Sequence, residues 1–319
     1  MSTVARLLAR LCSCKSEQVV TYEKPVDARR SSLVSTAART SISSPPDDAT
    51  THGDGTSPAQ LLAQKLLIQQ RLTKAQTRRG SDERYSERGE TTILLDFDDF
   101  LLATYEIRRR GLNWSELMSE AHELKPQFMR LERILTKFLL TCHSLGNIAI
   151  VTLAKPPWVQ LTMSNFLPNT KKAVASLEIP VYYALEELRA ADSAEGVKQM
   201  GTTLKQRAME SYLSKIYKNG KSWKNVISIG DSVYEQRALQ NVMHEYKVMT
   251  GNRKCRCKTV KLREQPDFDT LIHQLTILND YMEKLVKFQY SCDIDVTDAA
   301  AAQEVWLHWT RKLDGTNLN

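Results

Sequence analysis

Apolar residues between positions 91 and 290 follow two patterns that alternate along the chain. Short continuous apolar runs predict buried strands at residues 93–95, 148–151, 181–183, 226–229 and 246–249. Between these runs, apolar residues recur at spacings of three and four, which predicts helices at residues 131–142, 204–217, 235–239 and 268–286. Strands that alternate with helices are typical of an α/β protein, and we therefore expect a Rossmann-like parallel sheet with helices on both faces.

The residues before position 91 have a different composition. Residues 31–57 are rich in Ser, Thr, Ala, Pro and Gly and lack a lasting apolar period, which indicates disorder. A partial leucine stripe over residues 59–79 predicts a solvent-exposed helix that offers a surface to a partner. We therefore expect a disordered tail, a helical linker, an α/β domain and a C-terminal helical extension, at residues 1–57, 58–90, 91–290 and 291–319.

Residues 1–15 combine basic and apolar side chains with Cys12 and Cys14. Such a segment suits organellar targeting or S-acylation, and it equally suits a basic tail without a targeting role. The six cysteines form no Cys-x-x-Cys pair and follow no secretory signal, which indicates a reduced, intracellular protein, most simply a cytoplasmic one. No apolar run approaches the roughly 18 residues of a membrane span, so we expect no transmembrane segment.

Charge is dispersed along the chain, although the formal net charge is +7. Nucleic-acid-binding proteins usually gather their Lys and Arg on one face, whereas the basic clusters here are short and lie at residues 108–110, 171–172 and 253–258. We interpret these clusters as solvated charge, with contacts to an anionic ligand as the alternative. A chain of 319 residues with 42% hydrophobic and 25% charged residues is long enough for one sizeable α/β domain with tails.

Polar residues follow the predicted strands in a fixed order. Asp96, Asp98 and Asp99 come after the first strand, and Thr152 ends the second. The sequence Gly-Asp-Ser, with Asp231 at its centre, follows the fourth strand. Because the carboxyl ends of parallel strands lie at one edge of a sheet, we expect these side chains to converge there.

These residue types suit phosphoryl transfer. An ionised Asp96 is an adequate nucleophile toward phosphorus, and Asp98 can act as general acid and then as general base. Asp231 would complete an oxygen-lined Mg²⁺ site with Asp96 and Asp98. Taken singly, each residue has an ordinary explanation, because an Asp after a strand is often a turn former or helix N-cap and a helical Lys is usually solvated.

The order Asp96-Phe97-Asp98, Thr152, Lys205 and Gly230-Asp231-Ser232 resembles the haloacid dehalogenase-like superfamily of hydrolases, from about residue 91 to residue 275. The resemblance implies a parallel sheet, dependence on Mg²⁺, Asp96 as nucleophile and Asp98 as acid/base. It also implies that Thr152 and Lys205 bind the phosphate, that Asp231 binds the metal, and that further site residues are available at Glu235, Asp99 and Ser232.

One position departs from the family pattern. Many members carry Thr or Val where this chain has Phe100, and a ring above Asp96 would narrow the phosphate pocket, whereas a ring turned into the sheet would leave the pocket open. Only about fifty residues separate Asp98 from Thr152, which leaves little for a separate lid domain. The resemblance then implies a small-cap or capless member with an open site for a bulky or protein substrate. Aromatic residues available to line that site are Tyr105, Trp114, Trp158 and Phe166.

Two other doubly wound classes fit less well. A response-regulator receiver carries its acidic pair on the first strand and its phosphoacceptor on a later one, which is not the order seen here. A dinucleotide-binding domain needs a Gly-x-Gly-x-x-Gly loop after its first strand, and none is present. The sequence thus predicts a Mg²⁺-dependent phosphatase, with a catalytically weak pseudoenzyme that acts as a binding platform as the alternative.

Overall fold

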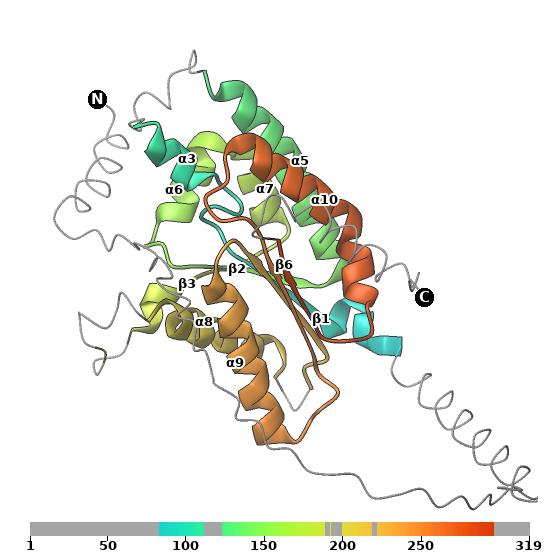
Figure 1. The fold of residues 1–319 in the computed structure, drawn as a ribbon. Helices are drawn as coiled ribbons and strands as arrows, with labels where there is room; N and C mark the ends of the chain where they lie inside the picture. The colour runs from blue at the N-terminus through green and yellow to red at the C-terminus, as the bar shows by residue number, and fades with distance from the viewer. Residues whose placement is uncertain (1–82, 112–122, 189–191, 193–199, 219–221, 297–319) are drawn as a thin grey trace, which may run out of the picture. The chain divides into compact units, whose positions relative to one another are not determined.

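The structure, a computed structural model, describes residues 83–111, 123–188, 192, 200–218 and 222–296. Six strands in these ranges form one sheet in the order β3-β2-β1-β4-β5-β6, and every neighbouring pair is parallel (Figure 1). The strands are β1 (Thr91–Leu95), β2 (Asn147–Thr152), β3 (Val181–Tyr183), β4 (Asn225–Gly230), β5 (Arg256–Lys261) and β6 (Cys292–Asp295). The predicted α/β class and parallel sheet are confirmed.

Helices cover both faces of this sheet. The α-helices of the described ranges are α3 (Thr104–Arg109), α5 (Lys125–Leu145), α6 (Trp158–Phe166), α7 (Pro168–Ser176), α8 (Gly201–Ile216), α9 (Val233–Thr250) and α10 (Phe268–Lys287). Short 3₁₀ turns lie at Glu83–Ser86, Arg88–Glu90 and Ala184–Glu187. Helices α5 and α10 pack together on one face, and α8 packs on α9 on the other (Figure 1).

The strands divide the core in two because their side chains alternate between the faces. On β1, Ile93 and Leu95 join the hydrophobic cluster under α5 and α10, whereas Leu94 joins the cluster under α8 and α9. All five residues of β1 are buried. A strand buried on both faces reads as a continuous apolar run, which is why the first strand was predictable.

The last two connections leave the sheet on opposite faces. From β4 to β5 the chain passes through α9, and from β5 to β6 it advances in the same direction through α10 on the other face. These two connections are therefore of opposite hand, although crossovers between parallel strands are right-handed in about 98% of cases. Because α10 covers only one face of β6, the residues of β6 alternate between buried and exposed.

The predicted fifth strand at residues 246–249 is wrong, since these residues end helix α9. Ser232 and Glu235 form a capping box at the start of this helix, and Gly251 ends it with a left-handed φ of 67°. Val248 and Met249 are 70% and 82% exposed, so this apolar run is not a core strand.

The actual fifth strand is β5, which begins inside the basic cluster at residues 253–258 that we interpret from the sequence as solvated charge. That interpretation is wrong for Arg256 and Lys258, which are both buried. The Lys258 ammonium donates to the carbonyl oxygens of Leu285 (2.7 Å) and Val286 (2.9 Å) at the carboxyl end of α10. The Arg256 guanidinium lies 3.6 Å from the centre of the Tyr85 ring. Helix carbonyls and an aromatic face thus take the place of water around these cations.

The sheet also extends past residue 290, because β6 lies in the segment predicted as a C-terminal extension. The tail over residues 1–57, the helix at residues 59–79 and the rest of the extension lie outside the described residues. None of the helices in the described ranges is both long enough and apolar enough to cross a membrane.

Candidate active site

The chain reverses its direction across the sheet between β1 and β4. It proceeds outward from β1 to β2 and β3, then returns to place β4 on the other side of β1. Asp96 follows β1, and its backbone N–H donates to the carbonyl oxygen of Ile229 (3.0 Å) on β4. Asp231 follows β4 directly. Ligands of open α/β sheets bind at this kind of switch point, beyond the carboxyl ends of the strands.

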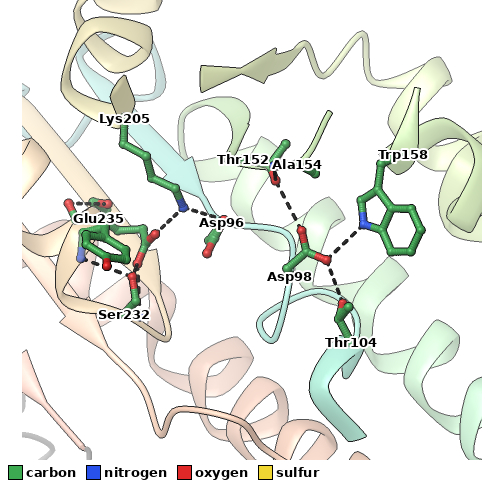
Figure 2. A network of polar contacts seen from close by, with 11 residues as sticks. Asp96, Asp98, Thr104, Thr152, Ala154, Trp158, Lys205, Ser232 and Glu235 are labelled. Carbon is green, nitrogen blue, oxygen red and sulfur yellow. Dashed lines mark hydrogen bonds and ion pairs between the residues drawn. The ribbon is translucent and has the colours of Figure 1, made fainter. Parts of the chain in front are cut away.

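Three carboxylates meet at this point, and we call Asp96, Asp231 and Glu235 the acidic cluster. Each contributes an oxygen that lies within 4.8 Å of the others, and all three residues are at least 94% buried. Lys205 is the fifth residue of α8, and its ammonium lies 2.6 Å from Asp96 Oδ1 and also pairs with Glu235 Oε1 (Figure 2). The structure therefore brings together Asp96, Asp231, Lys205 and Glu235.

The spacing Gly-Asp-Ser-x-x-Glu has a local cause. Glu235 Oε2 accepts hydrogen bonds from the backbone N–H of Ser232 (3.1 Å) and from its hydroxyl (2.6 Å), which closes the capping box of α9. The Glu235 side chain then passes over Gly230, where a Cβ atom would lie 2.7 Å from Glu235 Cγ. Glycine is required at this position because of the close approach. Ser232 thus serves as an N-cap that holds Glu235.

Burial and charge act against each other in the cluster. Burial raises the pKa of Asp96 well above its ordinary value, opposed by the Lys205 ammonium and reinforced by the carboxylates of Glu235 and Asp231. Burial would also raise the pKa of Glu235, but the charge and hydrogen bonds of Lys205 and Ser232 outweigh it, and that pKa is lowered. Burial opposes the charged form of Lys205, yet Asp96 and Glu235 together raise its pKa. These shifts favour the ion pair of Lys205 with Glu235 and disfavour the charged form of Asp96.

Asp98 points away from the acidic cluster. Its Oδ1 accepts hydrogen bonds from the Thr104 hydroxyl (2.8 Å) and from the indole Nε1–H of Trp158 (3.0 Å), and its Oδ2 faces the Thr152 hydroxyl at 3.5 Å (Figure 2). The Thr152 hydroxyl also accepts from the backbone N–H of Ala154 (3.0 Å). The site thus has two parts, the acidic cluster with Lys205 and a second group around the Asp98 carboxylate.

Asp99 shapes the loop between the two parts. It has a φ of 62°, in the left-handed region that Asp tolerates better than most residues. Its Oδ1 accepts from the backbone N–H of Tyr105 (2.7 Å) in the first turn of α3. Asp99 therefore supports the loop rather than the acidic cluster.

Phe100 turns its ring into the core. The residue is fully buried, and its ring meets that of Phe138 on α5 edge-on, with centroids 6.0 Å apart. Of the other aromatic residues considered for the site, Phe166 stacks on Phe128 in the core, and Tyr105 is 36% exposed. Trp114 lies outside the described residues. Trp158 donates a side-chain hydrogen bond to Asp98. Neither Trp158 nor Thr104 was predicted to contact Asp98, because no spacing along the chain relates them.

The acidic cluster suits a hard divalent cation. Its three carboxylates and the Lys205 ammonium carry a formal charge of −2 when all are ionised. Carboxylate oxygens are the ligands that Mg²⁺ prefers. Both oxygens of Glu235 are already engaged, by Lys205 and Ser232. Asp96 and Asp231 are therefore the residues that would hold the ion, with Glu235 behind them.

No protein-family model matches the chain, and neither a curated protein nor a solved structure matches it. What the site does must therefore be inferred from its own geometry and chemistry.

Proposed function

We propose that this protein is a Mg²⁺-dependent phosphomonoester hydrolase of the haloacid dehalogenase type, which acts through an aspartyl-phosphate on Asp96. The observation that carries the proposal is the buried Lys205 ammonium between Asp96 and Glu235, beside Asp231, at the switch point of the sheet. A structural ion pair needs one carboxylate, whereas this lysine contacts two carboxylates of a cluster of three. Strongly perturbed titratable groups at a ligand-binding edge are typical of active sites.

In the first step, a carboxylate oxygen of Asp96 attacks phosphorus and forms an O–P bond. The bond between phosphorus and the ester oxygen breaks, and the leaving oxygen takes a proton from Asp98. Thr152, whose hydroxyl faces Asp98 Oδ2, would contact the transferring group. When bound, Mg²⁺ supplies positive charge that keeps Asp96 ionised and offsets charge on the phosphoryl oxygens.

In the second step, water attacks phosphorus and the bond to Asp96 breaks, which releases inorganic phosphate. The Asp98 carboxylate, now ionised, accepts the proton of that water and returns to its starting form. Lys205 pairs with Asp96 throughout and stabilises its carboxylate as the leaving group. Each proton and each phosphorus–oxygen bond is thereby accounted for.

The proposed substrate is bulky or a protein, which the resemblance to the haloacid dehalogenase-like superfamily implies for a member without a large lid between Asp98 and Thr152. The described residues between Asp98 and Thr152 form α3 and α5, and α5 belongs to the layer that packs on α10. Residues 112–122, between these helices, are far fewer than the roughly 40 that an independent folded unit needs. The inward turn of Phe100 removes the feature that favoured a binding platform, so we retain the enzyme as the proposed function.

A phosphatase assay tests this proposal. Purified wild type, Asp96→Asn and Asp269→Asn are compared on a panel of phosphomonoesters and phosphopeptides, with Mg²⁺ and with a chelator. Asp269 lies on the exposed side of α10, in a surface ion pair with Arg130, and serves as the matched control. We expect Mg²⁺-dependent phosphate release from wild type and Asp269→Asn and none from Asp96→Asn. Equal activity in wild type and Asp96→Asn, or none in any protein, overturns the proposal.

A further inference from the structure

Trp158 donates a hydrogen bond that makes one oxygen of Asp98 a hydrogen-bond acceptor. The indole Nε1–H can only donate a hydrogen bond, so Asp98 Oδ1 must offer it a lone pair in either charge state of the carboxyl group. The Thr104 hydroxyl lies 2.8 Å from the same oxygen and has a second partner, the Leu102 carbonyl oxygen, at 3.2 Å. A hydroxyl can donate or accept, whereas the indole cannot. Trp158 is therefore the contact that makes Oδ1 an acceptor.

The indole itself is fixed by its surroundings. Trp158 is the first residue of α6 and is 8% exposed. Its carbonyl oxygen accepts from the Thr162 hydroxyl (2.8 Å), and the next backbone N–H, of Val159, donates to the hydroxyl of Tyr183 on β3 (3.2 Å). The first turn of α6 is thus tied to the sheet. Asp98 therefore receives its hydrogen bond from a buried indole on a backbone segment that is held against β3.

We propose that Trp158 is a positioning residue for acid/base chemistry, which reserves Asp98 Oδ1 as an acceptor and so assigns the transferable proton to Oδ2. Oδ2 is the oxygen on the Thr152 side, toward the carboxyl ends of β1 and β2 (Figure 2). This inference rests on the proposed phosphatase function and specifies which atom of Asp98 exchanges the proton. Without the indole, the carboxyl group can rotate or place its proton on Oδ1, where it no longer faces the leaving oxygen.

Leaving-group dependence tests this role. Wild type, Trp158→Phe and Trp223→Phe are compared on an aryl phosphate, whose leaving phenolate needs little protonation, and on an alkyl phosphate, whose leaving alkoxide requires it. General acid catalysis contributes about 10²–10⁴ in rate, and kcat/KM reports only the steps up to formation of the aspartyl-phosphate, where the leaving group departs. We therefore expect Trp158→Phe to lower kcat/KM on the alkyl substrate at least about tenfold more than on the aryl one. Trp223 stacks on Tyr246 in the other core cluster, and Trp223→Phe should affect both substrates equally.

The outcomes separate the two proposals. If wild type is active but Trp158→Phe lowers kcat/KM on the aryl and the alkyl phosphate by the same factor, the positioning role is overturned and the phosphatase proposal stands. If wild type is inactive, both are overturned.

A measurement without activity checks the contact itself. In protein labelled with ¹⁵N at its five tryptophans, the indole signal that disappears in Trp158→Phe should shift in Asp98→Ala. Asp269→Ala should leave it in place. An unchanged Trp158 signal in Asp98→Ala overturns the inference whatever the rates of Trp158→Phe. If Trp158→Phe fails to fold, triple-resonance assignment of the wild-type protein identifies the signal instead.

Discussion

Lys205→Met removes a buried cation that contacts two carboxylates of the acidic cluster. Lys205 is 1% exposed, and its ammonium pairs with Asp96 and Glu235. The methionine side chain is about as long as the aliphatic part of lysine and is uncharged, so the variant keeps the packing and removes the charge. Removal of one partner from a buried ion pair costs about 3–5 kcal/mol, because the remaining charge is left uncompensated. Asp96 can relieve part of this cost by taking up a proton, so we expect a loss of about 3 kcal/mol near neutral pH.

The loss should depend on pH with a defined sign. Without Lys205, the buried carboxylates of Asp96 and Glu235 have native pKa values above those of the unfolded chain. The native state then binds more protons than the unfolded state, and the variant loses stability as pH rises through that window. In wild type the pKa of Asp96 is also raised, but the Lys205 ammonium limits that rise, and the lowered pKa of Glu235 acts in the opposite direction. The gap between the two proteins should therefore widen from about pH 5 to about pH 8.

Urea unfolding followed by circular dichroism at several pH values measures this gap. Lys137→Met is the control, because Lys137 is an exposed residue of α5, outside the site. We expect Lys137→Met to follow wild type at every pH. If Lys205→Met is as stable as Lys137→Met throughout, or if the gap narrows as pH rises, the charge balance inferred for the cluster is wrong.

Three further substitutions test other parts of the structure. Gly230→Ala should displace the Glu235 side chain, since the new Cβ would lie 2.7 Å from Glu235 Cγ, and an unchanged melting temperature would contradict this. Phe100→Thr should destabilise the protein by about 3 kcal/mol or more in urea unfolding, because it empties a core site against Phe138, and it should not raise activity. Burial lowers the pKa of Lys258 to about 7, so between that pH and the ordinary value of 10.5 the unfolded state holds a proton that the native state lacks. Wild type should therefore gain stability relative to Lys258→Met as pH rises through this window, by at most about 1.4 kcal/mol per pH unit, and a flat difference would refute the lowered pKa.

The strands that could be predicted from the sequence were those that form continuous apolar runs. Ile93, Leu94 and Leu95 form a buried run, and Ile148 to Val151 form another, because strands covered on both faces need no polar alternation. The fifth strand was missed because it contains a buried lysine, Lys258. Its side-chain nitrogen donates hydrogen bonds to carbonyl oxygens of α10, which follows later in the chain. The face on which α10 lies is likewise set by tertiary packing against α5.

In the candidate site, too, some features follow from local sequence patterns and others depend on tertiary packing. Asp96, Asp231 and Lys205 were predictable as a group because they follow or face strand ends in a fixed order. The contact of Trp158 with Asp98 joins residues sixty positions apart and depends on how α6 enters the layer above β2. No sequence pattern carries that information, so the structure was needed to find it.

Detection of an aspartyl-phosphate on Asp96 tests the central claim most directly. Asp98→Asn is the protein to use, because it keeps the nucleophile and slows hydrolysis of the intermediate. After brief mixing with Mg²⁺ and a phosphomonoester, the acid-quenched protein is digested and its peptides are analysed by mass spectrometry. We expect a hydroxylamine-sensitive phosphoryl group on the peptide that contains Asp96, and none in Asp96→Asn treated in the same way. Phosphate release by wild type without any label on Asp96, or a label that persists in Asp96→Asn, would contradict the account.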